Sequence, residues 1–364
     1  MNQRRRGSQP ICMVLAVFAG GFAMTLAALA EMPEGPGLAA RYPGGAGIGA
    51  DPAVVFVEDF AEGALEDVRD RWGYARNLEG MAFSDDTPPG AAGTRALRMT
   101  GRRGEDQGGE LYKTFGGGGW DRVFLRFYTR FAADHGAHHH FVALRGFPDP
   151  DPWPAGGAGQ RPERHFSVTI EPSMASRNEF PPTRRFAPPG VWQFYAYWPE
   201  MQSWQSASGE PDGRPNPYYG NVFMPPDPGH SVRRGEWTCV EVMLKLNSDP
   251  DAKDGELALW LDGELAVHFA PGQPVGVMVG DHFRNHPEHS GAAPFEGFRW
   301  RRDMDTGVNV LRLQHYVSDR AWERTLAYAE ANPEFEVNTD EATVYFANIV
   351  LATEYIGPIT PAEE

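Results

Sequence analysis

The side chains best suited to chemistry in this sequence are tyrosines, histidines and arginines that recur at every second position of three predicted strands. The alternating polar sets are His165, Ser167, Thr169 and Glu171 in residues 164–171, Gln193, Tyr195 and Tyr197 in residues 192–198, and Arg312, Gln314, Tyr316 and Ser318 in residues 308–318. Successive side chains of a strand point to opposite faces, so each polar set lies on one face and the apolar residues between lie on the other. Each strand therefore has one face of hydrogen-bonding groups.

The residue types on these faces favour a sugar-binding surface. An ordinary solvated sheet face is the alternative for any single strand. Tyrosine rings, however, offer sugars a flat apolar surface with a polar edge. Lys245 and Asn247 on a predicted strand at residues 237–247 extend this polar surface, and His139 and Arg145 add to it.

Three consecutive histidines, His138, His139 and His140, raise the question of a metal site. In a strand only His138 and His140 share a face, and zinc needs a third ligand from elsewhere in the chain. We therefore predict no metal ligands here. His315 falls among the apolar residues of the strand at 308–318.

The acidic run at residues 249–256 is the other candidate for an ion site. Its acids miss the register of a calcium-binding loop by one residue, so it is interpreted as a solvated turn. No cofactor is required by this interpretation, and a structural calcium is the alternative.

The strands that carry these residues are predicted to form an antiparallel sandwich. Asp262 followed by Gly263, between two alternating runs, is the pair that most readily supplies the positive φ angles of a tight hairpin. Further strands are predicted at residues 53–60, 95–99, 110–115, 122–131, 138–146, 256–261, 265–269 and 343–355, with one helix at 319–331 and long loops at 148–163, 173–190, 201–235 and 284–294. Helices do not alternate with strands, which excludes a doubly wound fold. The predicted class is an all-β, antiparallel β-sandwich with long loops and one inserted helix.

The chain is predicted to begin with an export signal at residues 1–30. Three arginines precede an apolar run that ends in small residues, which is typical of a cleaved signal, and an uncleaved anchor helix is the alternative. A Gly-, Pro- and Ala-rich tether at 31–52, a single domain at 53–357 and a tail at 358–364 follow. The expected location is periplasmic or secreted, with no membrane contact after the signal is removed.

Charge and cysteine content narrow the function classes. The formal charge of −16 becomes −19 when the three arginines of the signal are removed, which argues against nucleic-acid binding. Only Cys239 remains in the mature chain, so stability comes from the core rather than from an intrachain disulfide. An acidic polymer as ligand requires a locally basic cleft, to which Arg177, Arg184 and Arg185 would contribute a rim.

The strands FLRFYTRF, HHHFVALRGF, EWTCVEVMLKLN, DGELALWLDGELA and YFANIVLATEYIG resemble those of secreted bacterial jelly rolls of the concanavalin A-like superfamily. Within it they most resemble the polysaccharide lyase-like branch, near lyase families fourteen and twenty. The E-x-D-x-E strand of the related glucanases does not occur here, which argues against that hydrolytic route.

The resemblance implies a lyase site in which a tyrosine is base and acid while His, Gln, Asn or Arg neutralises a uronate carboxylate. Arg312 stands four residues before Tyr316, as a lysine precedes the catalytic tyrosine of the alginate lyase branch. Tyr316 is then the predicted catalytic base, with Tyr197 second, and Arg312 and His165 assist. The predicted substrate-binding residues are Gln314, Lys245, Asn247, Tyr195, His139, Arg145 and Glu171.

The predicted function is binding of an acidic, uronate-containing polysaccharide, with cleavage by β-elimination. A non-catalytic carbohydrate-binding or matrix protein of the same fold is the main alternative, because fold does not fix chemistry. A glycosidase that uses Glu171 and Glu241 is the third hypothesis. The sequence makes no prediction of oligomeric state.

Overall fold

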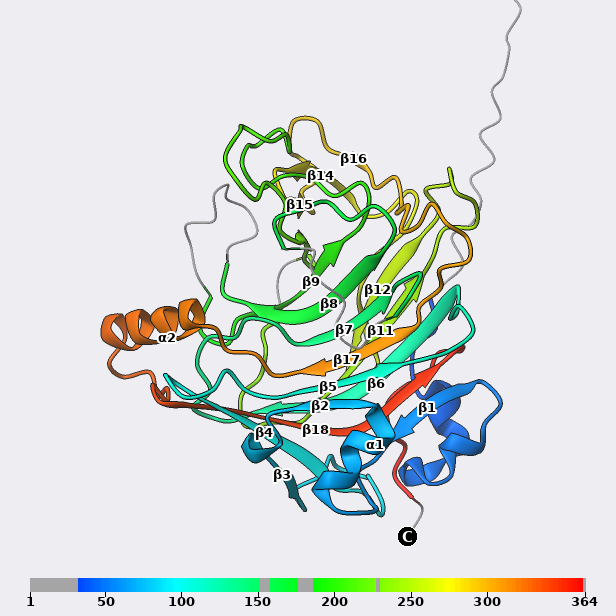
Figure 1. Ribbon diagram of the computed structural model, residues 1–364, viewed down its shortest axis with the longest axis vertical. Helices are drawn as coiled ribbons and strands as arrows, with labels where there is room; N and C mark the ends of the chain where they lie inside the picture. Colours follow the sequence, from blue (N-terminus) through cyan, green and yellow to red (C-terminus); the bar gives the residue numbers. More distant parts are fainter. Residues whose placement is uncertain (1–31, 151–157, 176–185, 227–229, 363–364) are drawn as a thin grey trace, which may run out of the picture. The chain divides into compact units, whose positions relative to one another are not determined.

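Two β-sheets packed face to face form the framework of the protein in this computed structural model (Figure 1). The structure describes residues 32–150, 158–175, 186–226 and 230–362, and residues 33–362 belong to one compact unit. The predicted signal at 1–30 and the predicted rim residues Arg177, Arg184 and Arg185 lie outside the described residues. None of the helices that the described residues form has both the length and the apolar character needed to cross a bilayer.

Sheet I has the strand order β13-β12-β11-β6-β18-β4-β3, and β1 also pairs with β18. Its strands are β1 (Val54–Glu58), β3 (Met81–Ser84), β4 (Ala96–Arg102), β6 (Arg122–Phe131), β11 (Thr238–Lys245), β12 (Glu256–Leu261), β13 (Glu264–Phe269) and β18 (Glu341–Ala352). All its neighbours are antiparallel.

Sheet II has the order β16-β14-β15-β10-β9-β8-β7-β17-β5-β2, and only its β10–β15 pair is parallel. Its strands are β2 (Tyr74–Arg76), β5 (Glu110–Thr114), β7 (Val142–Gly146), β8 (Phe166–Ser173), β9 (Val191–Tyr197), β10 (Asn221–Phe223), β14 (Val275–Val279), β15 (His282–Arg284), β16 (Ala293–Pro294) and β17 (Val310–Gln314). The predicted antiparallel all-β sandwich is thus confirmed, and the structure adds short strands that were not predicted, of which β10 and β16 lie inside predicted loops.

The hydrophobic core lies between the sheets. Every second residue of the central strands is buried in it, for example Val240 and Leu244 of sheet I and Val168 and Phe194 of sheet II. Burial of one face removes apolar surface from water, and the other face stays free for polar side chains. The core thereby fixes which side chains of sheet II point away from it.

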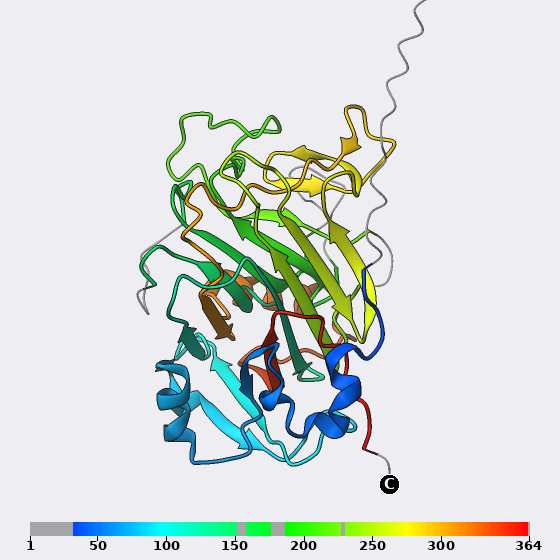
Figure 2. The ribbon, with the colours of Figure 1, turned by 90° about the vertical axis from the view of Figure 1, so that its right-hand side faces the viewer.

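The hairpin at the edge of sheet I has the predicted turn. β12 and β13 are joined through Asp262 with φ of 53° and Gly263 with φ of 87°, and β12 lies between β13 and β11 (Figure 2). Two successive positive φ angles match the right-handed twist of the flanking strands.

The predicted helix is α2 (Asp319–Ala331), which begins after Ser318, whose side chain accepts a hydrogen bond from the Ala321 backbone N–H. Its Thr325 hydroxyl accepts a hydrogen bond from the Ala137 N–H at 2.9 Å, so α2 covers the segment that precedes β7. The remaining helical elements are short: α1 (Val68–Trp72) and the 3-10 turns Gly37–Arg41, Pro43–Gly45, Ile48–Ala50, Leu65–Asp67 and Leu78–Gly80.

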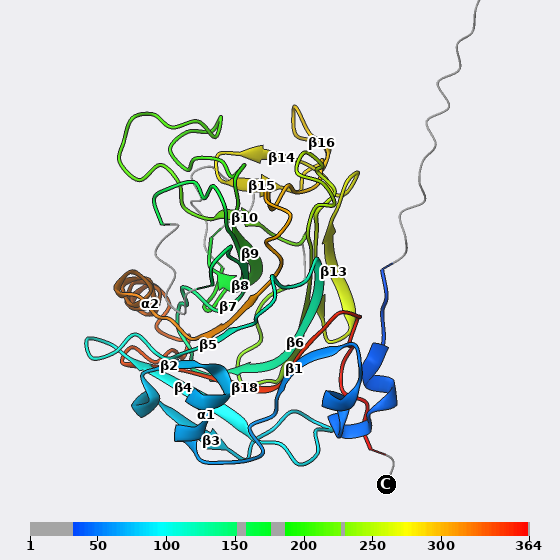
Figure 3. The same cartoon turned by 45° about the vertical axis from the view of Figure 1, so that its right-hand side comes forward.

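Residues 33–52 differ from the predicted tether, because they fold against the C-terminal segment (Figure 3). Leu38 and Ala39 are buried, and their backbone N–H groups donate to the carbonyls of Tyr355 and Ile356. The predicted tail is also anchored, since the Ile359 N–H donates to the Tyr128 hydroxyl. Glycine and alanine allow this close backbone packing and are also common in linkers, so the composition alone does not distinguish the two.

Candidate functional site

The three polar strand faces identified in the sequence come together on one face of sheet II, away from the core. The strands that carry them, β17, β8 and β9, are near neighbours, with β7 between β17 and β8. One row across the sheet reads Arg312, Ala143, Thr169 and Tyr195, and the next reads Val310, Arg145, Ser167 and Tyr197. Antiparallel register thus brings residues from distant parts of the chain side by side.

A pocket of about 170 Å³ lies over these rows. We call it the sheet II pocket. Its lining residues are His140, Ala143, Arg145, Ala158, His165, Ser167, Thr169, Tyr195, Tyr197, Arg312 and Gln314. Flat aromatic rings, two guanidinium groups and several hydrogen-bonding side chains therefore face one small space.

The two arginines of the pocket differ in how their charge is balanced. Arg312 donates to Glu110 Oε2 at 2.6 Å, and Gln314 donates to the same oxygen at 2.8 Å. Arg145 instead donates from Nε to the Ser167 hydroxyl at 3.0 Å, and among the described residues no carboxylate lies within ion-pair distance of it. Burial, and then the charge of Arg312, lower the pKa of Arg145.

His165 lies at the edge of the pocket, against Phe147. The two rings are stacked with centroids 5.0 Å apart. Burial and the nearby Arg145 lower the pKa of His165 to about 4, so this imidazole is neutral near pH 7. It can therefore both donate and accept a hydrogen bond without adding charge.

Buried Glu171 pairs with His140, a partly exposed residue that lines the pocket. His140 Nδ1 lies 2.9 Å from Glu171 Oε2, and Gln193 donates to the other carboxyl oxygen at 3.1 Å. Burial raises the pKa of Glu171 to about 8. This carboxyl is therefore largely protonated at neutral pH and offsets little of the arginine charge.

Tyr195 and Tyr197 stand on the same face of β9, with hydroxyl oxygens 3.4 Å apart. Burial raises the pKa of both phenols. The contact between the two hydroxyls has opposite effects on the two pKa values: it raises the pKa of Tyr195 and lowers that of Tyr197. Tyr197 is therefore the more readily ionised member of the pair.

The structure places most of the predicted site residues in or beside this pocket. Those that line it are Tyr197, Tyr195, His165, Arg312, Arg145 and Gln314. Glu171 contacts the pocket through His140, and His139 stacks on His140 with ring centroids 4.0 Å apart. Tyr316 lies just beyond β17, where its ring stacks on that of His140 at 5.9 Å.

Lys245 and Asn247 are not near the other predicted residues, and their expected place on one polar surface is corrected. Lys245 ends β11 in sheet I and pairs with Glu256 at 2.5 Å. Asn247 is fully buried, where its side-chain amide bonds the backbone of Asp249 and Arg301. Alternation shows which face of a strand is polar but not to which sheet the strand belongs.

Two contributors to the site were missed from the sequence, His140 and Glu110. Residues 138–140 belong to the predicted strand at 138–146, whereas β7 begins at Val142 and His140 precedes it. Glu110 opposes Gln314 in the β5–β17 register, which sequence spacing does not reveal. Apart from the pocket, three buried histidines in the described part of the chain, His135, His138 and His315, group closely enough to share a metal ion.

No family model matches the chain, and no curated protein matches it. Among solved structures, the alginate lyase Aly36B is 13% identical, with 86% of this chain and 99% of that chain covered and a TM-score of 0.49. The alginate lyase vAL-1 from Chlorella virus is 12% identical, with 82% and 99% covered and a TM-score of 0.49. An endo-beta-1,4-glucuronan lyase from the fungus Trichoderma reesei is 16% identical, with 82% and 95% covered and a TM-score of 0.37. At such identities the similarity concerns the fold, so the function is argued from the site.

Proposed function

We propose that this protein binds an acidic polysaccharide in the sheet II pocket and cleaves it by β-elimination at a uronate residue. The observation that carries the proposal is Arg145, a half-buried guanidinium beside Arg312 with no carboxylate partner among the described residues. A half-buried charge that no carboxylate neutralises is costly, and an anionic ligand would offset that cost.

The charge balance of the pocket supports an anion rather than a neutral sugar. Glu110 is the carboxylate that pairs with Arg312. Its Oε2 atom also lies 3.8 Å from Arg76 Nη2. Glu171 is largely protonated at neutral pH. The pocket is therefore locally positive although the whole chain has a formal charge of −16.

The same geometry supports elimination. The proton next to a uronate carboxylate is weakly acidic, and preorganised cations that neutralise the carboxylate make its removal easier. We propose that Arg145 and Arg312 bind the uronate carboxylate and that His165 and Gln314 form further hydrogen bonds with the substrate. Tyr197 would remove the proton.

In the proposed step ionised Tyr197 takes the proton next to the carboxylate. The electron pair left on carbon forms the new carbon–carbon double bond as the bond from the sugar to the glycosidic oxygen breaks. The Tyr197 hydroxyl then returns the proton to the departing oxygen. One unsaturated uronate end and one new reducing end result, and Tyr197 is again ionised, as at the start.

Tyr197 is preferred to Tyr316 as the base because it lines the pocket and its hydroxyl lies 3.4 Å from that of Tyr195, a contact that lowers the pKa of Tyr197. Tyr316 lies behind His140 and remains the alternative base. We also propose export through residues 1–30, which would bring the protein to extracellular polymers.

The test is incubation of the purified protein with a panel of uronate polymers and matched neutral polymers. We expect new ultraviolet absorbance, from the unsaturated product, with at least one uronate polymer and with no neutral one. New reducing ends without absorbance would instead indicate hydrolysis. If the protein bound glycans but formed neither product, it would be a carbohydrate-binding protein and the lyase proposal would be refuted.

A further inference from the structure

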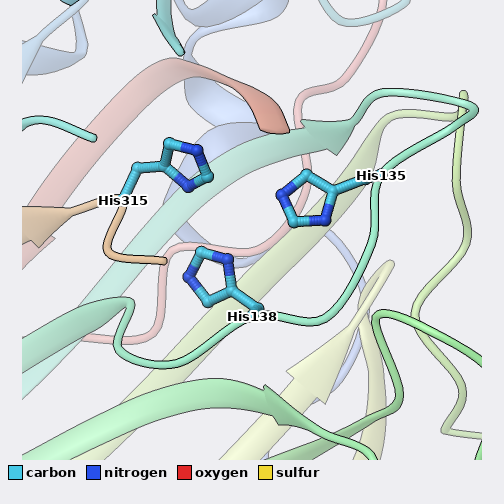
Figure 4. A group of neighbouring side chains, drawn as sticks. All are labelled: His135, His138 and His315. Carbon is cyan, nitrogen blue, oxygen red and sulfur yellow. The ribbon is translucent and has the colours of Figure 1, made fainter. Parts of the chain in front are cut away.

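His135, His138 and His315 form a buried cluster on the core side of sheet II (Figure 4). Their nearest ring nitrogens all lie within 4.8 Å of one another, and the side chains are 0%, 4% and 0% exposed. His135 and His138 come from the segment before β7, and His315 follows β17. The two segments are far apart in sequence and meet at these rings.

Each ring has one nitrogen that donates to a backbone carbonyl. His135 Nδ1 lies 2.8 Å from the Gly136 oxygen, His138 Nε2 lies 2.9 Å from the His140 oxygen, and His315 Nε2 lies 2.8 Å from the Ala342 oxygen. A carbonyl only accepts, so the proton of each neutral imidazole is on that nitrogen and the other nitrogen carries a lone pair. Carbonyls that hold ligand histidines in this way are common around bound metals.

The three lone-pair nitrogens are His135 Nε2, His138 Nδ1 and His315 Nδ1, and all three are buried without a hydrogen-bond partner among the described residues. Aromatic rings enclose them. Phe131 contacts His135 and His138 edge-on, with centroids 4.9 and 5.6 Å apart, and Phe141 contacts His138 at 5.2 Å. Three adjacent unsatisfied acceptors in an apolar site are costly unless something binds them.

We propose that these three histidines bind a zinc ion that holds the segment before β7 against the end of β17. Neutral imidazole is a preferred ligand of zinc, and three histidines with water as the fourth ligand is a known zinc arrangement. Zinc–nitrogen bonds of about 2.0–2.1 Å in a tetrahedron place ligand nitrogens about 3.4 Å apart. Binding therefore draws the rings together by at most about 1.4 Å.

The position of the cluster gives the ion a structural role. His138 is two residues from His140, and His315 lies between Gln314 and Tyr316. The backbone of Tyr316 already bonds that of His140. An ion on the core side would hold these two segments from behind the sheet II pocket, independently of what the pocket binds.

The proposal is tested on untagged protein, because an affinity tag of histidines would itself bind zinc. The protein is depleted with a chelator, dialysed against zinc and analysed for metal content. We expect one zinc per chain and, at a free zinc concentration of 100 Kd, a rise in Tm of about 5 °C. X-ray absorption at the zinc edge should show nitrogen ligands from three imidazoles, a measurement that needs no variant.

The matched variants are His315→Leu at the cluster and His289→Leu at an exposed loop position. His289→Leu should keep the full equivalent of zinc and the Tm shift, whereas His315→Leu should lose both. If the cluster were only a packing feature, an apolar leucine would leave Tm unchanged or raise it, with no zinc response even in the original protein. Less than a tenth of an equivalent of zinc in the original protein, or copper or nickel bound in its place, would overturn the assignment.

Discussion

The hydroxyl oxygens of Tyr195 and Tyr197 lie 3.4 Å apart on one face of β9, and the contact affects the two phenols unequally. It raises the pKa of Tyr195 and lowers that of Tyr197, against a background in which burial raises both. The two tyrosines are therefore not interchangeable. Removal of either hydroxyl should have its own kinetic signature.

Tyr197→Phe should lower kcat by about 10³-fold with little change in KM, because it removes the proposed acid and base but not the groups that hold the carboxylate. Tyr195→Phe should retain measurable activity and move the rising, low-pH limb of the pH–rate profile to higher pH, since Tyr197 loses the contact that lowers its pKa. Initial rates of ultraviolet absorbance at several pH values measure both effects. Full activity in Tyr197→Phe, together with loss in Tyr316→Phe, would assign the base to Tyr316.

Arg145→Gln should weaken binding of a uronate oligosaccharide by about 10- to 100-fold, because a charge-assisted hydrogen bond contributes about 1.5–3 kcal/mol. Titration calorimetry with a non-cleaved oligosaccharide measures this change. Arg122→Gln, an exposed arginine of β6 in sheet I, is the control and should leave the affinity unchanged. If Arg145→Gln and the original protein bound the oligosaccharide with equal affinity, the uronate would not bind at Arg145 in this pocket.

The sequence predicted the sandwich well because alternation is a local property. In 164–171 and 192–198 the apolar set became core and the polar set became the pocket face, since each strand must bury one side. The hairpin at Asp262 and Gly263 and the helix α2 followed from local turn and helix signals in the same way.

What the sequence did not predict depends on pairing between distant strands. Lys245 alternates correctly within β11, yet β11 lies in the sheet opposite to β17. The ion pair of Glu110 with Arg312 joins residues 202 positions apart. His138 lies within the predicted strand at 138–146, but β7 begins only at Val142, and the irregular segment before it lets His138 turn toward His135 and His315. No spacing rule in one sequence fixes such contacts.

Gly263→Ala should destabilise the protein by about 1–2 kcal/mol, because the residue has φ of 87° and an added Cβ would approach Pro358 Cγ to 3.0 Å. Gly291→Ala is the matched control, with φ of 88° and nothing within 4 Å of an added Cβ. Gly291→Ala should lower the free energy of unfolding by less than Gly263→Ala, and the difference between the two variants gives the cost of the contact with Pro358. Urea unfolding of both variants measures it. Equal losses would mean that backbone strain alone sets the cost at Gly263.

Glu241 gives a pH dependence of stability that is separate from the pocket. It is buried in sheet I, where its carboxyl oxygens accept the backbone N–H groups of Ile356 and Gly357 at 2.7 and 2.8 Å. Burial nevertheless raises its pKa to about 7, against an ordinary value of 4.5. Between these two pH values the folded protein keeps a proton that the unfolded chain releases.

The contribution of Glu241 to the free energy of unfolding is therefore fully present below pH 4.5 and is lost as the pH rises through 7. Relative to Glu241→Gln, the original protein should lose stability by at most about 1.4 kcal/mol per pH unit across this interval, and the difference should level off above pH 8. Urea unfolding at intervals of half a pH unit measures it, with the exposed Glu288→Gln as a control whose difference stays constant. A difference that instead grows in favour of the original protein as the pH rises would mean that the two backbone hydrogen bonds outweigh burial, because only then would the folded state favour the carboxylate.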